Sequence, residues 1–443
     1  MAAYSVAARY PALLQTSEGA WRTRLYAGIF LILLALHTLV PIERGFPVIQ
    51  LADGYSVTVT ILASLVCFLC LVIESNGAIF KSAGSRVYLQ WQCLFAAALL
   101  VAATLSADAK PALFVALNYF ICFVLNFLIL RYLFTHGNRR TYIAIVCTVA
   151  SAAAVLGLIE RTAGYYLPFY RDAFLNFDYA QMSFAMAQTG DTFRVLGPLG
   201  SPILHAVVLS LALPFAMELK GALRWIVAGL LIASILLSTA MTGALMMACY
   251  AMGRLVGYAR KLRVFALIGC ALALTAVIGV IATVDLDGNE AQPIQRVIYG
   301  DGRNVQARLE MIEMGISKVV NFDDAAGLFV GRGLKSSREL VMTPGAAYFS
   351  TFDNAWLTVA YEAGIPAFLF FVAVQIAVLW HLRRFSAISA HWWGVFGWCA
   401  AGASFVTLYY STCNFLWVAL VAWLWTEQSF PQARAPQGRA RTS

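Results

Sequence analysis

Long apolar runs alternate with short polar connections along most of the chain. About twelve of these runs approach the roughly 20 residues that a helix needs to cross the hydrocarbon core of a bilayer. They lie near residues 25–42, 56–73, 87–105, 111–130, 141–159, 202–217, 223–238, 241–257, 264–284, 355–380, 394–410 and 412–426. The pattern predicts an all-α polytopic membrane protein with about twelve transmembrane helices.

Two of the connections between these runs are too long to serve only as turns. They span residues 160–201 and 285–354, and the second separates the ninth predicted helix from the tenth. We therefore divide the chain into N-terminal transmembrane helices at 1–159, a second membrane region at 160–430 that includes loop 285–354, and a disordered basic tail at 431–443. Binding and catalytic residues concentrate in long loops, so function is sought there first.

Composition and charge agree with a membrane protein and give it an orientation. Of the 443 residues, 61% are hydrophobic and 12% are charged, against about 25% charged in soluble domains, which excludes a cytosolic globular enzyme. With both termini placed in the cytoplasm, the cytoplasmic side holds 19 of the 31 basic residues and four of the 22 acidic residues. The net charge of +9 therefore reflects positive-inside topology, and we expect no nucleic-acid partner.

The longer outer loop contains a helical pattern of its own. Within residues 303–322, apolar side chains recur at steps of three and four, at Val305, Leu309, Ile312, Ile316, Val319 and Val320. This spacing predicts an amphipathic helix that lies on the membrane surface or caps the helical bundle, with Arg308 off the apolar stripe.

A glycine-rich stretch follows that predicted helix. Gly331 and Gly333 flank Arg332, and Lys335 comes two residues later. Backbone N–H groups beside cations suit phosphate oxygens, whereas the same spacing is equally compatible with a plain turn.

Polar residues also mark the start of the tenth predicted helix. Asp353 and Asn354 stand where the outer loop meets the apolar run, and Glu362 lies nine residues beyond Asp353, about 13 Å deeper along a helix. An ionisable residue at that depth is a candidate site residue. Gly364 and Pro366 predict a kink just behind it.

The shorter outer loop ends in a comparable block. Arg194 lies a few residues before Ser201, which is a candidate N-cap, and Pro202, which is a candidate first helical residue.

In their order and spacing, these blocks resemble the O-antigen ligase and O-antigen polymerase superfamily of bacterial inner-membrane proteins. The resemblance covers roughly residues 190–380. The matching elements are Arg194–Val195–Leu196–Gly197 followed by Ser201–Pro202, Arg308 in the loop helix, Gly331–Arg332–Gly333, Asp353–Asn354, and Glu362–Ala363–Gly364–Ile365.

The resemblance implies a glycosyltransferase of the inner membrane whose active site faces the periplasm. Its donor is an undecaprenyl-diphosphate-linked oligosaccharide, its acceptor is a sugar hydroxyl on a glycan or a lipid-linked glycan, and neither metal nor cofactor is expected. Membrane lipids, a flippase and a chain-length regulator are the other expected partners. Ligases of the superfamily typically carry His where this chain has Asp353, and an arginine is common at the position of Met241. The Asp-Asn pair is more similar to repeat-unit or exopolysaccharide polymerases, so polymerase is the favoured hypothesis. A ligase that joins glycan to lipid A–core or protein, and a lipid-linked glycan flippase, are the alternatives.

The resemblance also suggests residue roles, each with a simpler alternative. Arg194 and Arg308 would grip the diphosphate, assisted by Arg332 or Lys335, because guanidinium groups bind phosphate in a bidentate manner. Alternatively, Arg194 contacts lipid headgroups and Arg308 pairs with a loop acid.

Asp353 would act as general base in an inverting attack, with Asn354 and Glu362 binding the substrate. Alternatively, Asp353 only caps the helix and Glu362 is a structural acid bonded to a neighbouring helix. His37 and His205 are expected to be core histidines. The late tryptophans, Trp392, Trp393, Trp417, Trp423 and Trp425, are expected mostly in the membrane interface.

Overall fold

The computed structural model describes thirteen stretches of the chain. They are residues 17–39, 47–52, 55–80, 86–106, 109–167, 195–238, 240–258, 312–320, 324–334, 336–337, 354–383, 390–402 and 411–429.

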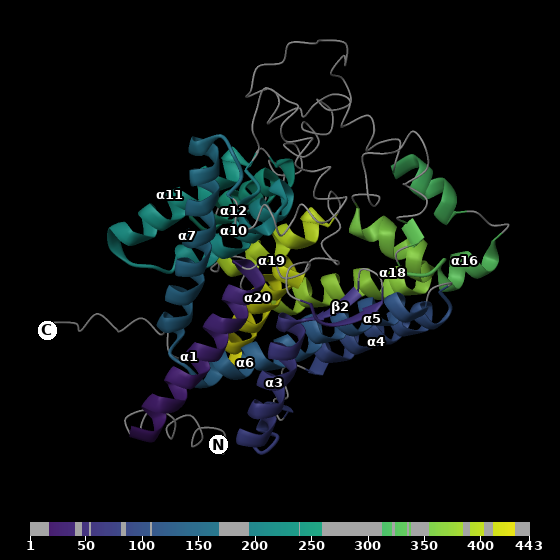
Figure 1. The fold of residues 1–443 in the computed structure, drawn as a ribbon, viewed down its shortest axis with the longest axis horizontal. Helices are drawn as coiled ribbons and strands as arrows, with labels where there is room; N and C mark the ends of the chain where they lie inside the picture. Colours follow the sequence, from purple (N-terminus) through teal and green to yellow (C-terminus); the bar gives the residue numbers. More distant parts are fainter. Residues whose placement is uncertain are drawn as a thin grey trace, which may run out of the picture.

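Helices account for nearly all of the described chain (Figure 1). The first half holds α1 (Ser17–Thr38), α3 (Val59–Glu74), α4 (Arg86–Thr104), α5 (Ala109–Phe120), α6 (Asn126–His136) and α7 (Arg139–Ala163). The second half holds α10 (Pro202–Ala216), α11 (Gly221–Leu237), α12 (Met241–Tyr258), α16 (Ala325–Val330), α18 (Ala355–Leu382), α19 (Ala390–Ala401) and α20 (Ser411–Ser429). Short 3₁₀ turns are η3 (Ala78–Phe80) and η6 (Gly197–Leu199), and the π-helical segment η5 (Ile121–Leu125) joins α5 to α6.

Eleven of the twelve predicted apolar runs overlap a described helix, and the ninth, 264–284, lies outside the described residues. Five helices are long and apolar enough to cross a membrane, namely Gly19–Thr38, Arg86–Thr104, Ala112–His136, Arg139–Ala163 and Ala355–Leu382. The other apolar helices are shorter, so the membrane character is supported while the number of spans stays a prediction.

One antiparallel β-hairpin, which the sequence analysis did not predict, interrupts the helices. Strands β1 (Pro47–Ala52) and β2 (Tyr55–Thr58) pair with Pro47 opposite Thr58 and Ala52 opposite Tyr55. The sequence between them is Asp53–Gly54, a dipeptide typical of two-residue hairpin turns.

The core of the bundle is built around α20. Every residue from Cys413 to Thr426 is buried, because this helix is apolar on all sides and neighbouring helices surround it. Trp417 stacks on Trp398 of α19 with ring centroids 4.6 Å apart. The expectation of an interfacial location is therefore wrong for Trp417, Trp423 and Trp425, which are at most 3% exposed.

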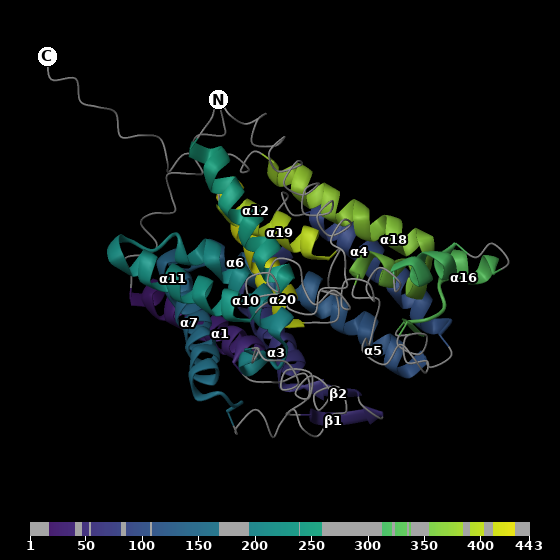
Figure 2. The same cartoon turned by 90° about the horizontal axis from the view of Figure 1, so that it is seen from above.

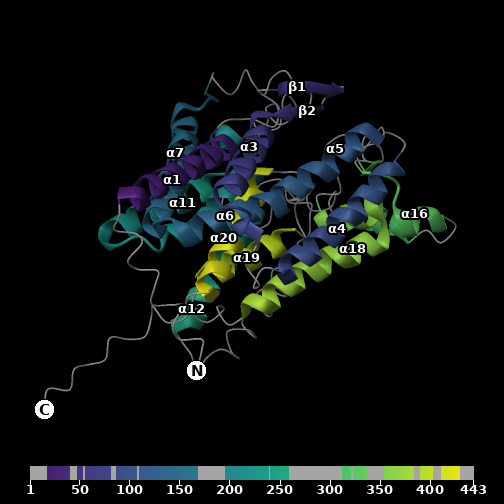
Figure 3. The same cartoon turned by 90° about the horizontal axis from the view of Figure 1, so that it is seen from below.

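The remaining helices lie on either side of this centre along the longest axis. All three views place α7 and α11 toward one end and α4, α5, α16 and α18 toward the other (Figures 1, 2 and 3). α10 packs against α7 and α11. The two regions considered below, at the end of α7 and beside α16, therefore lie far apart in the molecule.

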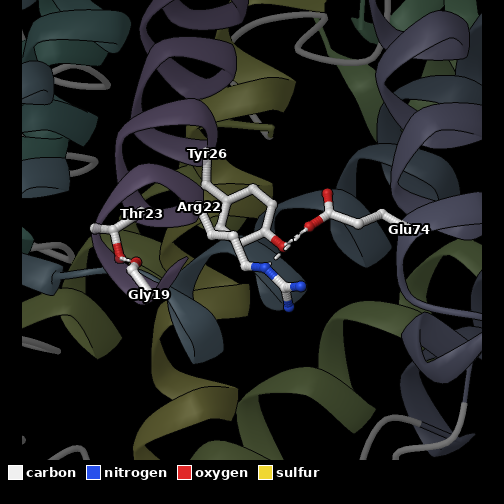
Figure 4. Close-up of polar contacts among 5 residues, drawn as sticks. All are labelled: Gly19, Arg22, Thr23, Tyr26 and Glu74. Atoms are coloured by element: carbon white, nitrogen blue, oxygen red, sulfur yellow. Dashed lines mark hydrogen bonds and ion pairs between the residues drawn. The ribbon is translucent and has the colours of Figure 1, made fainter. Parts of the chain in front are cut away.

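A polar contact ties the first two long helices together. Figure 4 shows Arg22 and Tyr26 of α1 directed at the carboxylate of Glu74, the last residue of α3. The Tyr26 hydroxyl donates to Glu74 Oε1 at 2.8 Å, and Arg22 Nε lies 4.0 Å from the same oxygen. This contact fixes the beginning of α1 against the end of α3.

Two similar contacts tie later helices. Arg139 Nη2, at the start of α7, donates to Thr426 Oγ1 of α20 at 2.9 Å. His391 Nδ1 of α19 lies 3.8 Å from Glu218 Oε1, just after α10. Each contact joins the ends of two helices that are distant in sequence.

Candidate functional site

The structure describes three of the seven predicted site residues. These are Arg332, Asn354 and Glu362, all on or beside α18. The other four, Arg194, Arg308, Lys335 and Asp353, lie outside the described residues. The candidate site is therefore built from its described neighbours.

Asn354 is the N-cap of α18. Its backbone is extended, with φ −144° and ψ 113°, and its side-chain oxygen accepts a hydrogen bond from Leu357 N at 3.0 Å. The sequence analysis allowed Asp353 to be the cap, but Asn354 occupies that position. The N-cap position of α18 therefore belongs to Asn354, and Asp353 precedes it in the sequence.

The helix that follows this cap is broken, as its sequence predicts. Gly364 has φ 81° and ψ 169°, which no α-helical residue adopts. Pro366 has no N–H group, so it cannot donate to the carbonyl of Glu362 four residues earlier. The break therefore leaves the carbonyls of Tyr361 and Glu362 in need of other donors.

The glycine-rich stretch supplies those donors. Arg332 N donates to Tyr361 O at 3.1 Å, and Gly333 N donates to Glu362 O at 3.0 Å. The approach is possible because residue 331 is glycine, where a Cβ atom would come within 2.2 Å of Glu362 O. Gly331 and Gly333 also have positive φ angles of 85° and 99°.

The neighbouring N–H groups are also used inside the protein. Gly331 N donates to Gly327 O at 3.1 Å, and Leu334 N donates to Ser106 Oγ at 3.1 Å. Four consecutive N–H groups, from residue 331 to residue 334, are thus engaged with the protein. Of the two interpretations of this stretch, the structure supports the turn and not a backbone cradle for phosphate.

The Arg332 side chain braces the same junction. Its Nη2 lies 3.0 Å from Asp324 Oδ2, and its guanidinium lies 4.8 Å from the ring centroid of Tyr361. Asp324 in turn caps α16 by accepting from Gly327 N at 2.8 Å. The Arg332 side chain is 19% exposed and pairs with Asp324 through Nη2, whereas Nη1 is buried with no hydrogen-bond partner among the described residues.

Glu362 is 1% exposed, and its carboxylate faces the loop. Glu362 Oε1 accepts hydrogen bonds from Ser337 Oγ at 2.5 Å and from Ser337 N at 3.4 Å. The alternative to substrate binding was a structural acid bonded to a neighbouring helix. The structure shows a buried acid bonded to the loop, which fastens residues 336–337 to the broken helix.

A second buried carboxylate, which the sequence analysis did not single out, holds the shorter loop. Glu160, in the last turn of α7, is 0% exposed. Its Oε2 accepts from Leu196 N at 3.1 Å and from Gly197 N at 2.8 Å. The sequence held one signal for this residue. Glu160 is an acid directly after the fifth apolar run, at the start of the loop that ends in the Arg194 block.

The two donors form an anion-binding turn. Leu196 has φ −95° and ψ −36°, and Gly197 has φ 59°. A right-handed residue followed by a left-handed one directs successive N–H groups to the same side, where they can bind an anion. Ser201 then caps α10 by accepting from Leu204 N, and Pro202 is the first helical residue, as predicted.

His205 packs directly under this turn. Its Nε2 lies 2.9 Å from Ser234 Oγ of α11, and that hydroxyl donates to Ala154 O of α7 at 3.4 Å. A Cβ atom on Gly197 would come within 2.3 Å of His205 Nδ1. The prediction of core histidines is confirmed, since His205 is 0% and His37 is 4% exposed.

The two anchored blocks are not neighbours. The Glu160 contact belongs to the α7 end of the molecule, whereas Arg332 lies against α18 beside α16 (Figures 1, 2 and 3). The structure therefore does not bring Arg332 to the block that Arg194 begins. The start of α18 meets the end of α19, where Ala355 N donates to Gly402 O at 2.8 Å.

Within the described stretches, no three His, Cys, Asp or Glu side chains are grouped closely enough to hold a metal ion. Cys67 and Cys70, a C-x-x-C pair in α3, are both free thiols. No protein-family model matches this chain, and no curated protein sequence matches it.

Proposed function

We propose that this protein is a membrane-embedded glycosyltransferase that polymerises glycan repeats carried on undecaprenyl diphosphate, at the periplasmic face of the bacterial inner membrane. The observation that carries the proposal is the ordered set of Arg194, Arg308, Gly331–Gly333 and Asp353–Asn354 blocks. A rigid scaffold is needed for electrostatic catalysis, because preorganised charges lower a barrier only when they are already in place. The buried carboxylates of Glu160 and Glu362 support this requirement, since each fastens a loop block to a helix.

The proposal includes twelve spans with both termini in the cytoplasm. Contacts between distant segments agree with this topology on both sides. The pairs Arg22–Glu74, Arg139–Thr426 and Glu218–His391 join segments assigned to the cytoplasm or to inner helix ends. The pairs Ser106–Leu334 and Glu160–Gly197 join segments assigned to the periplasm.

In the proposed reaction, Arg194 and Arg308 hold the diphosphate of the donor. The acceptor hydroxyl gives its proton to the Asp353 carboxylate while its oxygen attacks the anomeric carbon from the side opposite the phosphate. The bond from that carbon to the phosphate oxygen breaks, and undecaprenyl diphosphate leaves with the bonding electrons. The guanidinium groups stabilise the negative charge that grows on the leaving group, and the anomeric configuration is inverted.

Arg332 has a smaller part in this proposal than the sequence suggested. Its ion pair with Asp324 and its place against Tyr361 make it a brace for the break in α18. Glu362 is likewise committed to Ser337. We therefore assign diphosphate binding to Arg194 and Arg308, with Lys335 as the remaining assisting cation.

The first test replaces Arg194, Arg308 and Asp353 singly with Ala and examines surface glycan in a deletion strain. Each substitution is expected to lower transfer by about 100-fold or more, because each removes a group that acts in the transition state. Arg161→Ala, at an exposed arginine beside Glu160, is the matched control. Normal long-chain glycan in all three variants, at normal membrane levels, would exclude the mechanism.

Chain length in the same strains distinguishes polymerase from ligase. Loss of a polymerase leaves single repeats on the final acceptor, whereas loss of a ligase leaves long polymer on the carrier lipid. The base role has its own test, since Asp353→Asn keeps the shape of the side chain but cannot take a proton. Full activity of that variant would reject Asp353 as the base.

A further inference from the structure

Glu160 combines complete burial with two backbone hydrogen bonds to a loop. The side chain is 0% exposed, and one oxygen, Oε2, accepts from Leu196 N and Gly197 N at 3.1 and 2.8 Å. These donors belong to the block that begins with Arg194, and the acceptor belongs to the end of a candidate membrane span.

The Glu160 carboxylate and the two N–H groups compensate each other for the loss of water on burial. A buried carboxylate is costly unless hydrogen bonds replace its hydration, and buried N–H groups are costly without an acceptor. Breaking the contact therefore removes two hydrogen bonds from the carboxylate and leaves the Leu196 and Gly197 N–H groups without this acceptor, so the turn has a strong preference for one position against α7.

Packing around the contact restricts the turn further. Val195 is 0% exposed, and a Cβ atom on Gly157 of α7 would come within 2.6 Å of Val195 Cγ1. His205 fills the space beneath Gly197 on the α10 side. The turn is thus held by hydrogen bonds from α7 and by side chains from two directions.

We propose that Glu160 is a positioning residue: it fixes the turn at Val195, Leu196 and Gly197, which directly follows in the chain the arginine assigned to the diphosphate, Arg194. This inference rests on the proposed function. The constraint is covalent, because consecutive Cα atoms in any chain are about 3.8 Å apart and Val195, the residue after Arg194 in the sequence, is buried. A guanidinium placed about 1 Å away from its productive position can lower a rate about 100-fold. Glu160 acts through Arg194 and does not touch the substrate.

A binding measurement tests this role without knowledge of the sugars. The probe is undecaprenyl diphosphate without a glycan, and the dissociation constant is measured by native mass spectrometry of the purified full-length chain. We expect Arg194→Ala to weaken binding about 100-fold, because the hydrogen bond from the arginine to the diphosphate is lost. We expect Glu160→Ala to weaken binding about tenfold, because that hydrogen bond is displaced and not removed. Glu160→Gln keeps one acceptor oxygen and is expected to recover part of the loss.

The double variant separates positioning from general destabilisation. If Glu160 acts through Arg194, the Glu160→Ala/Arg194→Ala protein binds no more weakly than Arg194→Ala alone. Independent contributions would multiply to about 1000-fold, and this result would overturn the proposal. Ser210→Ala is the matched control, since it removes a buried hydroxyl of α10 whose hydrogen bonds go to Ala206 O and Gly243 O, away from the turn.

Amide hydrogen exchange checks that the anchor itself has been released. Glu160→Ala is expected to accelerate exchange at Leu196 and Gly197 at least tenfold, and Ser210→Ala is expected to leave it unchanged. Binding of undecaprenyl diphosphate within twofold of wild type in a Glu160→Ala protein with fast exchange would overturn the positioning role. If the carrier lipid binds as expected but wild-type membranes transfer no glycan, the proposed function fails and the positioning role stands.

Discussion

The described ends of the two long loops are fastened to neighbouring helices by opposite arrangements of donors and acceptors. At the end of α7 the helix supplies the acceptor, the Glu160 carboxylate, and the loop supplies two N–H groups in a turn with a left-handed glycine. At α18 the helix is itself broken, and two of its backbone carbonyls accept from Arg332 N and Gly333 N.

The difference shows what the glycines of each block do. Gly197 allows a turn to bind the side chain of Glu160. A single substitution of Glu160 can therefore remove this contact. Gly331 allows the backbone of the loop to meet the backbone of α18. Both hydrogen-bonding groups are backbone atoms, so changing a side chain does not remove them. In both places the glycine allows the loop to dock against a helix.

The largest expected effect comes from adding a methyl group at each glycine. Gly331→Ala places Cβ within 2.2 Å of backbone on α18 at φ 85°, and we expect a loss of about 3 kcal/mol or more in the free energy of unfolding. Gly197→Ala meets the His205 ring, which can shift, and is expected to cost less. Thermal unfolding of the purified proteins measures both.

Gly229→Ala in α11 is the control, since nothing lies within 4 Å of its Cβ position. It is expected to leave the unfolding temperature unchanged or to raise it slightly. Equal losses at positions 331 and 197 would remove the distinction between backbone and side-chain docking.

A smaller effect is expected from Ser337→Ala. The substitution removes a hydroxyl that donates to the buried Glu362 carboxylate at 2.5 Å, and a hydrogen bond to a charged group contributes about 2 kcal/mol. Ser317→Ala, at an exposed hydroxyl bonded only within its own helix, should change stability by less than about 0.5 kcal/mol. If the two variants were equally stable, Glu362 would not be an anchor comparable with Glu160.

The smallest effects are expected at the Arg332–Asp324 pair. Asp324 is 41% exposed, so solvent screening limits the contribution of the pair to about 0.5 kcal/mol. Asp324→Asn keeps the cap of α16, and Arg332→Lys keeps the charge. Both are expected to leave glycan transfer within about twofold of wild type. If Arg332→Lys alone lowered glycan transfer tenfold at unchanged stability, Arg332 would have to be assigned to diphosphate binding after all.

Local signals predicted several features of these regions correctly. Ser201 and Pro202 begin α10, and Gly364 with Pro366 breaks α18, because capping and proline geometry depend on only a few adjacent residues. One alternative placed the cap of α18 at Asp353, one residue before its position at Asn354, because Asp and Asn have similar capping preferences.

Features that depend on distant partners were not predictable in the same way. The apolar stripe of the 303–322 helix is one example, since its described part, 312–319, buries Val319 against Tyr361 but leaves Ile316 52% exposed. The buried tryptophans of α20 are another. Aromatic residues at the end of an apolar run suit both a lipid interface and a protein core, and only the neighbouring helices decide.

The sequence by itself determined that the chain forms apolar helices suited to a membrane, where several of them begin and break, and which loop blocks carry the cations. These properties follow from spacing and from the conformational limits of single residues. The tertiary structure decided what the polar groups in those blocks bind. Glu160 meets Leu196 and Gly197 across more than 30 residues of chain, and Ser106 meets Leu334 across more than 200. Hydrogen bonds of this kind satisfy groups buried by packing, so the packed helices, and not the local sequence, select the partners.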